Sequence, residues 1–416
     1  MRKRNQRSLE GAMYSGRFPT NHRGLSKASV REKVYPLENK YFDKTGSQRV
    51  FLATWGNKRN PTQQTQSPKA DWLNRTQRFN NTVQDIVANV MANGEVAKTP
   101  SLAKRLVKLM EYDTLLRVPL QGHMTMMAYE VLENPVNLTE QNLYKAQVVS
   151  CAMELAQSYF LIMDDFEDQS KMRHGQPCWH LLPEVNNLIL NDACMFRSLV
   201  NDILKEHLDG SVYTKMIDIF NEMYLFVAIG QYLDNTIPKA KDISLYTHDN
   251  YSKIVRYKCT YYCLEIPIML ALILCEKDNE PTFQRIRDIV RDVGFLYQMM
   301  NDYTDLSNEE SKSGKTGSDI QEGKCTFYAV KTLERATPEQ KEIFKSSYGS
   351  WDPEHVKRIR NLYKELDLIS LYKDQHNFKY NQFIKNINDL PSDDILTPEL
   401  FVKMMEASNL NNWEIY

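Results

Sequence analysis

The stretch QVVSCAMELAQSYFLIMDDFED, residues 147–168, combines an apolar stripe with a cluster of acidic side chains. Its apolar residues recur at spacings of four, three, four and three, the period of an α-helix: Val149, Met153, Ala156, Phe160 and Met163. A second such stripe follows later in the chain: Ile286, Ile289, Val293, Leu296 and Met300. No strand-like alternation runs over a comparable length. These patterns predict an all-α fold.

Each stripe ends in acidic residues. Asp164 and Asp168 are four residues apart, so they share the inward helix face of Phe160. Two carboxylates on such a face repel each other unless a cation joins them, and hard oxygen ligands suit Mg²⁺. The second stripe ends in Asn301-Asp302-Tyr303-Thr304-Asp305. A solvated helix end would explain either cluster alone, but two clusters that each close a buried stripe favour a metal site.

Basic residues follow both clusters. Lys171, Arg173 and His174 come after the first, whereas Lys312, Lys315 and Lys324 come after the second, and Lys258 lies between. Lysine and arginine beside a carboxylate-bound metal can hold a diphosphate and stabilise its charge as it leaves. A solvated surface role is the alternative for any single lysine.

Composition excludes several other classes. The net charge of −1 and pI near 6.7 argue against nucleic acid or an anionic membrane as a partner. The seven cysteines are scattered and form no CxxC pair, as expected of a reduced intracellular protein without structural zinc. The longest apolar run, Ile266 to Cys275, is too short to cross a bilayer and predicts a buried helix.

The N-terminus has a different character. The first 34 residues carry nine basic side chains against Glu10 and Glu32, with no apolar core typical of a secretory signal. This composition fits an organelle transit peptide or a disordered extension without an address. We expect residues 1–70 to be a poorly ordered extension and residues 71–416 to be the catalytic domain, in the cytoplasm or mitochondria.

Several blocks together resemble farnesyl diphosphate synthases. They are Glu154 to Asp168 with Arg173-His-Gly-Gln-Pro-Cys-Trp179, then Tyr257-Lys258, Asn301 to Asp305, Gly314-Lys-Thr-Gly-Ser-Asp-Ile-Gln321 and Lys324-Cys325. They occur in the family's order from about residue 71 onward. The resemblance implies the isoprenoid synthase fold, one bundle around a deep central cavity, as a homodimer.

The resemblance also implies roles for individual residues. Mg²⁺ would be bound by Asp164, Asp165, Asp168, Asp302 and Asp305, with Asn301 as a neutral oxygen ligand where the family has aspartate. The diphosphate would be bound by Arg173, Lys258, Lys315 and Lys324, and Asp164, Asp165 and Lys258 would be catalytic. Gln231 and Asp234 would line the same cavity, and Gln298 would contact substrate. Tyr159 and Phe160 resemble the cavity floor that limits products to fifteen carbons.

The departures from the family pattern concern a second anion site, for isopentenyl diphosphate. The family's GGKxxRG motif corresponds to residues 116–122, with Val118 in place of its lysine and Gln121 in place of its arginine. His174 stands where the family has a second arginine, and residues 412–416 replace a basic tail. Arg117, displaced by one position, is at best a partial substitute.

A protein that keeps the ionising residues but loses the acceptor site resembles a terpene synthase derived from a prenyltransferase, a type known among insects. We therefore expect Mg²⁺-dependent ionisation of farnesyl diphosphate, with geranyl diphosphate next, to a sesquiterpene hydrocarbon or alcohol. Asn301, Asp305 and Glu309 weakly parallel the metal motif of terpene cyclases. Candidate cation-stabilising residues, each alternatively ordinary core, are Tyr159, Phe160, Tyr261, Tyr262, Tyr297 and Met300. The alternatives are a farnesyl diphosphate synthase and a catalytically silent regulatory subunit.

Overall fold

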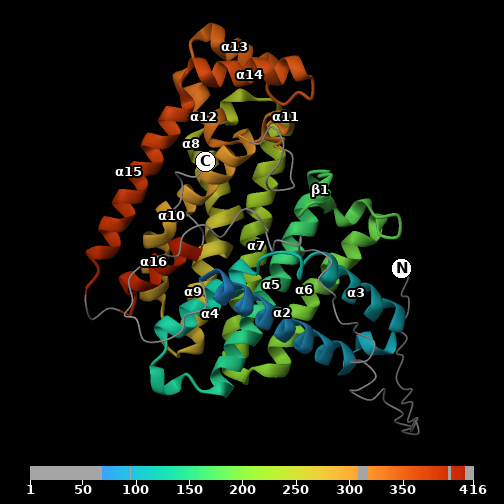
Figure 1. The fold of residues 1–416 in the computed structure, drawn as a ribbon. Helices are drawn as coiled ribbons and strands as arrows, with labels where there is room; N and C mark the ends of the chain where they lie inside the picture. The colour runs from blue at the N-terminus through green and yellow to red at the C-terminus, as the bar shows by residue number, and fades with distance from the viewer. Residues whose placement is uncertain (1–67, 94, 308–316, 392–394, 408–416) are drawn as a thin grey trace, which may run out of the picture. The chain divides into compact units, whose positions relative to one another are not determined.

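The computed structural model describes residues 68–93, 95–307, 317–391 and 395–407, with residues 68–75 by backbone alone. Figure 1 shows the helices, whose bounds are α2 Pro68–Asn93, α3 Pro100–Tyr112, α4 Leu120–Leu132, α5 Glu140–Glu167, α6 Ile189–His207, α7 Gly210–Ala240, α8 His248–Ile254, α9 Ile266–Leu274, α10 Glu280–Ser307, α11 Asp319–Glu322, α12 Phe327–Arg335, α13 Pro338–Ser347, α14 Pro353–Glu365, α15 Leu368–Asn388 and α16 Pro398–Ala407. Within the described ranges, the strands β1 (Met172–Arg173) and β2 (Gln176–Pro177) pair as one short antiparallel hairpin. The all-α prediction is confirmed.

Helix α5 carries the stripe from which the fold was predicted. The side chain of Thr139 caps its N-terminus by accepting a hydrogen bond from the backbone N–H of Asn142. Val149, Met153 and Ala156 are buried, and the helix packs between α4 and α6. Ile286, Val293 and Leu296 of the second stripe are likewise buried along α10, and Ile289 and Met300 are partly buried. Both apolar faces therefore form the main core, and the acidic residues lie at the ends of core helices.

A π-helical segment, Val255–Glu265 (η6), joins α8 to α9 and carries Lys258. Two glycines let neighbouring helices press against it. A Cβ at Gly230 of α7 would lie 2.3 Å from the backbone N of Lys258, and one at Gly294 of α10 would lie 1.9 Å from Oγ1 of Thr260. The wider π-helical turn, which often occurs at functional sites, is thus held between α7 and α10.

Among the described residues, two helical spans are long and apolar enough to cross a membrane, α5 and residues 248–274. However, 72% and 78% of their most apolar windows are buried inside the protein. Packing in the core therefore accounts for their apolar character. The predicted buried helix at Ile266 is α9, whose residues are buried almost throughout.

Candidate active site

Arg173 binds the carboxylates at the end of α5. The hairpin β1–β2 presents it, because His174 and Gly175 form a two-residue turn with φ of 53° and 74°. The guanidinium donates two hydrogen bonds of 2.7 Å to Asp165 and one of 3.2 Å to Asp164. Burial opposes the charge, but these carboxylates raise the pKa of Arg173. The first aspartate cluster and the first predicted diphosphate ligand thus lie together.

Lys258 pairs with a carboxylate on α5 and with another on α7. Its Nζ lies 2.9 Å from Oδ1 of Asp164 and 2.6 Å from Oδ2 of Asp234. Burial opposes the charge on the ammonium, but the carboxylates of Asp164, Asp234 and Asp168 raise the pKa of Lys258 well above its usual value. Lys258 therefore remains a cation near pH 7, beside the end of α5.

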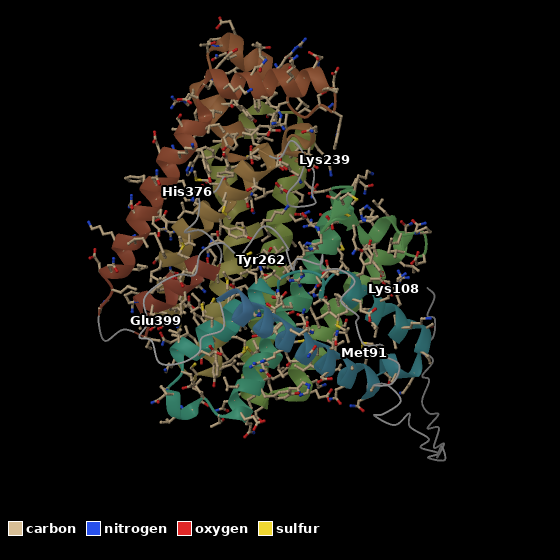
Figure 2. The ribbon with its side chains drawn as sticks, in the orientation of Figure 1. Met91, Lys108, Lys239, Tyr262, His376 and Glu399 are labelled. Atoms are coloured by element: carbon tan, nitrogen blue, oxygen red, sulfur yellow. The ribbon has the colours of Figure 1, made fainter. Side chains whose placement is uncertain are left out.

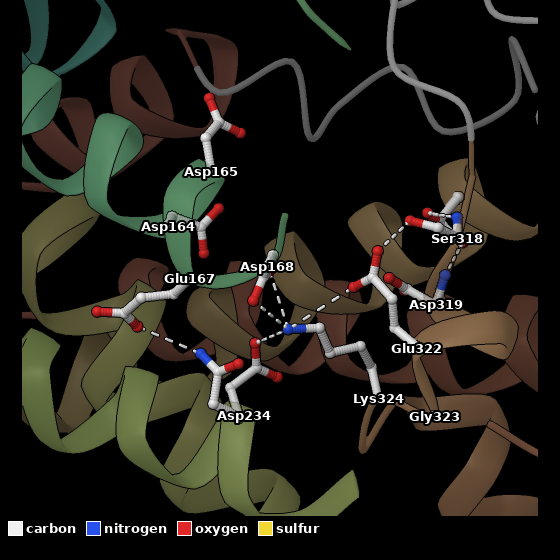
Figure 3. Close-up of polar contacts among 12 residues, drawn as sticks. Asp164, Asp165, Glu167, Asp168, Asp234, Ser318, Asp319, Glu322, Gly323 and Lys324 are labelled. Carbon is white, nitrogen blue, oxygen red and sulfur yellow. Dashed lines mark hydrogen bonds and ion pairs between the residues drawn. The ribbon is translucent and has the colours of Figure 1, made fainter. Parts of the chain in front are cut away.

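Lys324 makes the matching link to the chain after α11. Its Nζ lies 2.9 Å from both carboxylate oxygens of Asp168, 2.9 Å from Asp234 and 3.8 Å from Glu322, as Figure 3 shows. Burial acts to raise the pKa of Asp234, but the two ammonium groups outweigh it and lower that pKa. Asp234 therefore bridges both lysines as a carboxylate.

The second acidic cluster is oriented differently from the first. Asp302 is 3% exposed, and its carboxylate accepts hydrogen bonds from Tyr251, Gln298 and the backbone N–H of Phe327 at 3.0, 2.8 and 2.7 Å. Burial raises the pKa of Asp302 to about 7. Metal binding by Asp302 and substrate contact by Gln298 remain predictions, and these hydrogen bonds compete with both.

Asp305 and Asn301 complete that cluster. Asp305 accepts hydrogen bonds from the backbone N–H groups of Ser318 and Asp319 at 3.0 and 3.1 Å, just before α11. Ser318 in turn donates to Glu322, which faces Lys324 (Figure 3). A chain of polar contacts thus joins the two acidic helices. The side chain of Asn301 is exposed, one residue from the buried Asp302.

The donor chemistry of the first cluster fits Mg²⁺. Asp164 and Asp168 offer hard carboxylate oxygens, and neither histidine nor cysteine lies among the predicted ligands. Like-charge repulsion from Asp164 adds to burial in raising the pKa of Asp168, as expected where carboxylates gather. In the described part of the chain, no three acidic, histidine or cysteine side chains are arranged around one metal position, and the lysines and Arg173 pair with the carboxylates.

An aromatic layer lies directly beneath the ion pairs. Phe160 is one turn below Asp164 and Tyr262 is one turn below Lys258, and their ring centroids are 5.3 Å apart. Phe160 also contacts Tyr159 and Tyr224 at 5.3 and 5.6 Å. Figure 2 shows Tyr262 among the central helices. The remaining candidates, Tyr261, Tyr297 and Met300, belong to the same core, and Tyr261 packs on Phe226 at 4.6 Å.

The expected acceptor site contains a cation that is already neutralised. Arg117 is 8% exposed and forms an ion pair with Glu154, and it also donates to the backbone O of Glu154 and to Ser158. Asp113 lies 3.6 Å away. Gln121 is 4% exposed and donates to the thiol of Cys263 at 3.6 Å. Partial desolvation lowers the pKa of His174, which favours its neutral form.

Several predicted residues lie elsewhere. Lys312, Lys315, Glu309 and residues 1–67 and 408–416 lie outside the described residues. Gln231, which was predicted to line the cavity, lies one turn before Asp234. The Nε2 of Gln231 is buried without a partner in the described part of the chain. In the described part of the chain, a cavity of about 240 Å³ lies beside Arg256 and Phe295, and a small space of about 10 Å³ lies beside Asp305 and Tyr363. Neither is lined by Asp164, Lys258 or Phe160. All seven cysteines are free thiols.

Three residues of the site were not predicted from the sequence. Glu154 neutralises Arg117, Glu322 faces Lys324, and Tyr224 packs on Phe160. Only Tyr224 left a usable signal, since it precedes Gln231 by seven residues and therefore shares its helix face. The partners of the two glutamates depend on how distant segments pack.

Comparison with known proteins gives consistent matches. The family model described as Polyprenyl synthetase matches residues 119–366. Farnesyl pyrophosphate synthase 2 of Cannabis sativa is 34% identical over 271 residues, 64% of this chain and 79% of that protein. Farnesyl pyrophosphate synthase of Murgantia histrionica is 31% identical over 305 residues, 73% of this chain and 75% of that protein. The mitochondrial farnesyl pyrophosphate synthase 1 of Arabidopsis thaliana is 34% identical over 258 residues, 61% of this chain and 67% of that protein.

The family model covers more than half of the chain, and the matched region includes α5, α7, α10 and all the lysines and carboxylates of the ion-pair network. The chain therefore belongs to the polyprenyl synthetase family.

Proposed function

We propose that this protein ionises an allylic isoprenyl diphosphate, preferably farnesyl diphosphate, and converts the resulting cation to a sesquiterpene. The ionisation step is supported by Arg173 and by Lys258 and Lys324, each of which pairs with carboxylates at the end of α5. The neutralised Arg117 is the observation that carries the choice of terpene synthase. Without further cations, a second diphosphate has no charged partner at that position.

The proposed mechanism uses residues at the end of α5. When bound, Mg²⁺ would be held by Asp164 and Asp168 and would supply positive charge to the diphosphate. Lys258, Lys324 and Arg173 would exchange carboxylate partners for diphosphate oxygens and stabilise the charge that develops on the leaving group. Beneath them, the π faces of Phe160 and Tyr262 would stabilise the hydrocarbon cation.

The loss of affinity for isopentenyl diphosphate can be estimated from the contacts that are missing. A charge-assisted hydrogen bond contributes about 1.5–3 kcal/mol. Val118 and Gln121 remove two such contacts, which corresponds to a loss of about 10²- to 10⁴-fold in affinity for isopentenyl diphosphate. Arg117 offers no compensation while Glu154 and Asp113 surround its guanidinium.

A second candidate is a farnesyl diphosphate synthase. The relatives reported above carry that name, and this favours condensation over lyase chemistry. In that case isopentenyl diphosphate would bind through contacts other than Val118 and Gln121. The ionisation step and its residues would be the same in both enzymes. The two candidates differ only in whether the allylic cation reacts alone or with isopentenyl diphosphate.

The deciding experiment is a product assay on the purified full chain with Mg²⁺. One reaction contains farnesyl diphosphate alone, and the other contains geranyl and isopentenyl diphosphates. We expect a volatile C15 product in the first and no elongation in the second. Elongation in the second with no turnover in the first would establish the prenyltransferase instead. Inactivity in both would favour the silent subunit.

A matched pair of variants tests the site itself. Asp164→Asn removes a carboxylate from the proposed metal and Lys258 contacts, and should abolish diphosphate release in both reactions. Asp249→Asn removes an exposed carboxylate that pairs with Lys253 on α8, and should leave the rate unchanged. Full activity of Asp164→Asn would contradict the proposed site.

The expected homodimer also remains a proposal. Leu225, Ile229 and Tyr232 are exposed apolar residues at spacings of four and three on α7, which would suit a second copy. Sedimentation measurements at several concentrations test this. For location, cytoplasm and mitochondria both remain open, and the latter is supported by the mitochondrial relative of Arabidopsis thaliana.

A further inference from the structure

Three helical elements show the same order of residues on their inward faces. On α5, Asp164 lies one turn above Phe160, and on η6, Lys258 lies one turn above Tyr262. On α7, Gln231 lies two turns above Tyr224. The contacts confirm that these faces meet, because Asp164 pairs with Lys258 at 2.9 Å and Phe160 contacts both Tyr262 and Tyr224. Tyr224 therefore belongs to the aromatic layer beneath the ion pairs.

The hydroxyl group of Tyr224 is unusual within this layer. The residue is 6% exposed, and its Oη is buried without a hydrogen-bond partner in the described part of the chain. Most buried polar groups have a partner, and an unpaired hydroxyl destabilises the fold. Burial raises the pKa of Tyr224, so the group is a neutral phenol with an unused oxygen. Among the described residues, no structural interaction accounts for this oxygen.

The ring of Tyr224 is held on two sides. Tyr159 meets it edge-on, with centroids 5.3 Å apart and planes at 87°. The guanidinium of Arg197 lies 4.5 Å from the ring centroid and occupies one π face. Because Arg197 is exposed, water screens its charge from the interior. These contacts hold the ring in place. The hydroxyl oxygen makes none of them, so its dipole can stabilise a positive charge nearby.

We infer that Tyr224 is a specificity-determining residue whose oxygen dipole selects among the cations formed from the allylic substrate. The inference rests on the proposed ionisation. A fixed oxygen in a water-poor layer stabilises positive charge near it more strongly than it would in water. Cationic intermediates with charge close to Oη are therefore favoured over isomers with charge elsewhere. Tyr224 takes no part in binding the diphosphate.

The test is Tyr224→Phe, which removes only the oxygen. The full chain is incubated with farnesyl diphosphate and Mg²⁺, products are separated by gas chromatography, and diphosphate release is measured in parallel. We expect the ratio of the two main products to shift about tenfold, the effect of one lost polar contact. Diphosphate release should stay within about threefold, and the melting temperature should not fall, because an unpaired hydroxyl has been removed.

Tyr363→Phe is the matched control. Its hydroxyl is also buried, but it lies on α14 beside the small cavity, and Tyr348 is the side chain next to it there. The control should leave the product ratio unchanged. If the protein condenses isopentenyl diphosphate instead, the same variants are compared by the ratio of C15 to C20 products. An unchanged ratio in Tyr224→Phe, or a lowered melting temperature, overturns the inference. Absence of diphosphate release from farnesyl diphosphate alone overturns the proposed function but not the Tyr224 assignment.

Discussion

Replacing Asp234 by asparagine should weaken the proposed diphosphate site without removing any predicted ligand. Asp234 is 7% exposed and accepts charge-assisted hydrogen bonds of 2.6 Å from Lys258 and 2.9 Å from Lys324. Two such bonds are worth about 3–6 kcal/mol together. The lower value applies, because in the free protein Lys258 also pairs with Asp164 and Lys324 also pairs with Asp168. A loss of about 3 kcal/mol corresponds to about 10²-fold in kcat/KM.

The assay is diphosphate release with farnesyl diphosphate, supported by calorimetric binding of inorganic pyrophosphate in the presence of Mg²⁺. We expect both to weaken in Asp234→Asn and to recover partly in Asp234→Glu. Asp249→Asn is the control, since its side chain is 74% exposed and its ion pair contributes little. If Asp234→Asn kept kcat/KM within threefold of the unchanged protein, the bridging role of this carboxylate would be refuted.

Three further outcomes follow from the structure. Gly230→Ala should displace Lys258, lower the stability by about 1–3 kcal/mol and reduce kcat/KM, whereas Gly210→Ala, which meets no atom within 4 Å, should do neither. For His376, which is fully buried, desolvation lowers the pKa to about 4, so the unfolded chain binds a proton that the folded chain does not as the pH falls below about 6.5. The free energy of unfolding, measured with denaturant, should therefore fall between pH 7 and pH 5 by about 2 kcal/mol less in His376→Gln than in the unchanged protein. An equal fall in both proteins would contradict this assignment. A chelator should abolish diphosphate release, and added Mg²⁺ should restore it; activity that persists in the chelator would exclude the metal.

The candidate site could be predicted in part. Asp164 and Asp168 were placed on one inward face because their spacing matches the helical turn, and the structure places both beside lysines that the resemblance indicated. Arg173 was indicated by its place after the first cluster and by the resemblance, but the hairpin turn at His174-Gly175 that presents it to Asp165 was not predicted. The second cluster was less predictable, since a stripe of residues on α10 does not reveal that Asp302 points into hydrogen bonds from α8 and α12.

The sequence by itself determined the helices, their buried faces and the positions of charged residues along them, because these depend on neighbours three or four residues away. Only the tertiary structure decided which charges meet. Glu154 neutralises Arg117 across 37 residues, and Lys324 reaches Asp168 across 156. Such pairs form when helices pack at particular distances and rotations, as where Gly230 admits the backbone of Lys258 against α7. A buried charge must find a partner wherever packing places one, so its partner is a property of the whole fold.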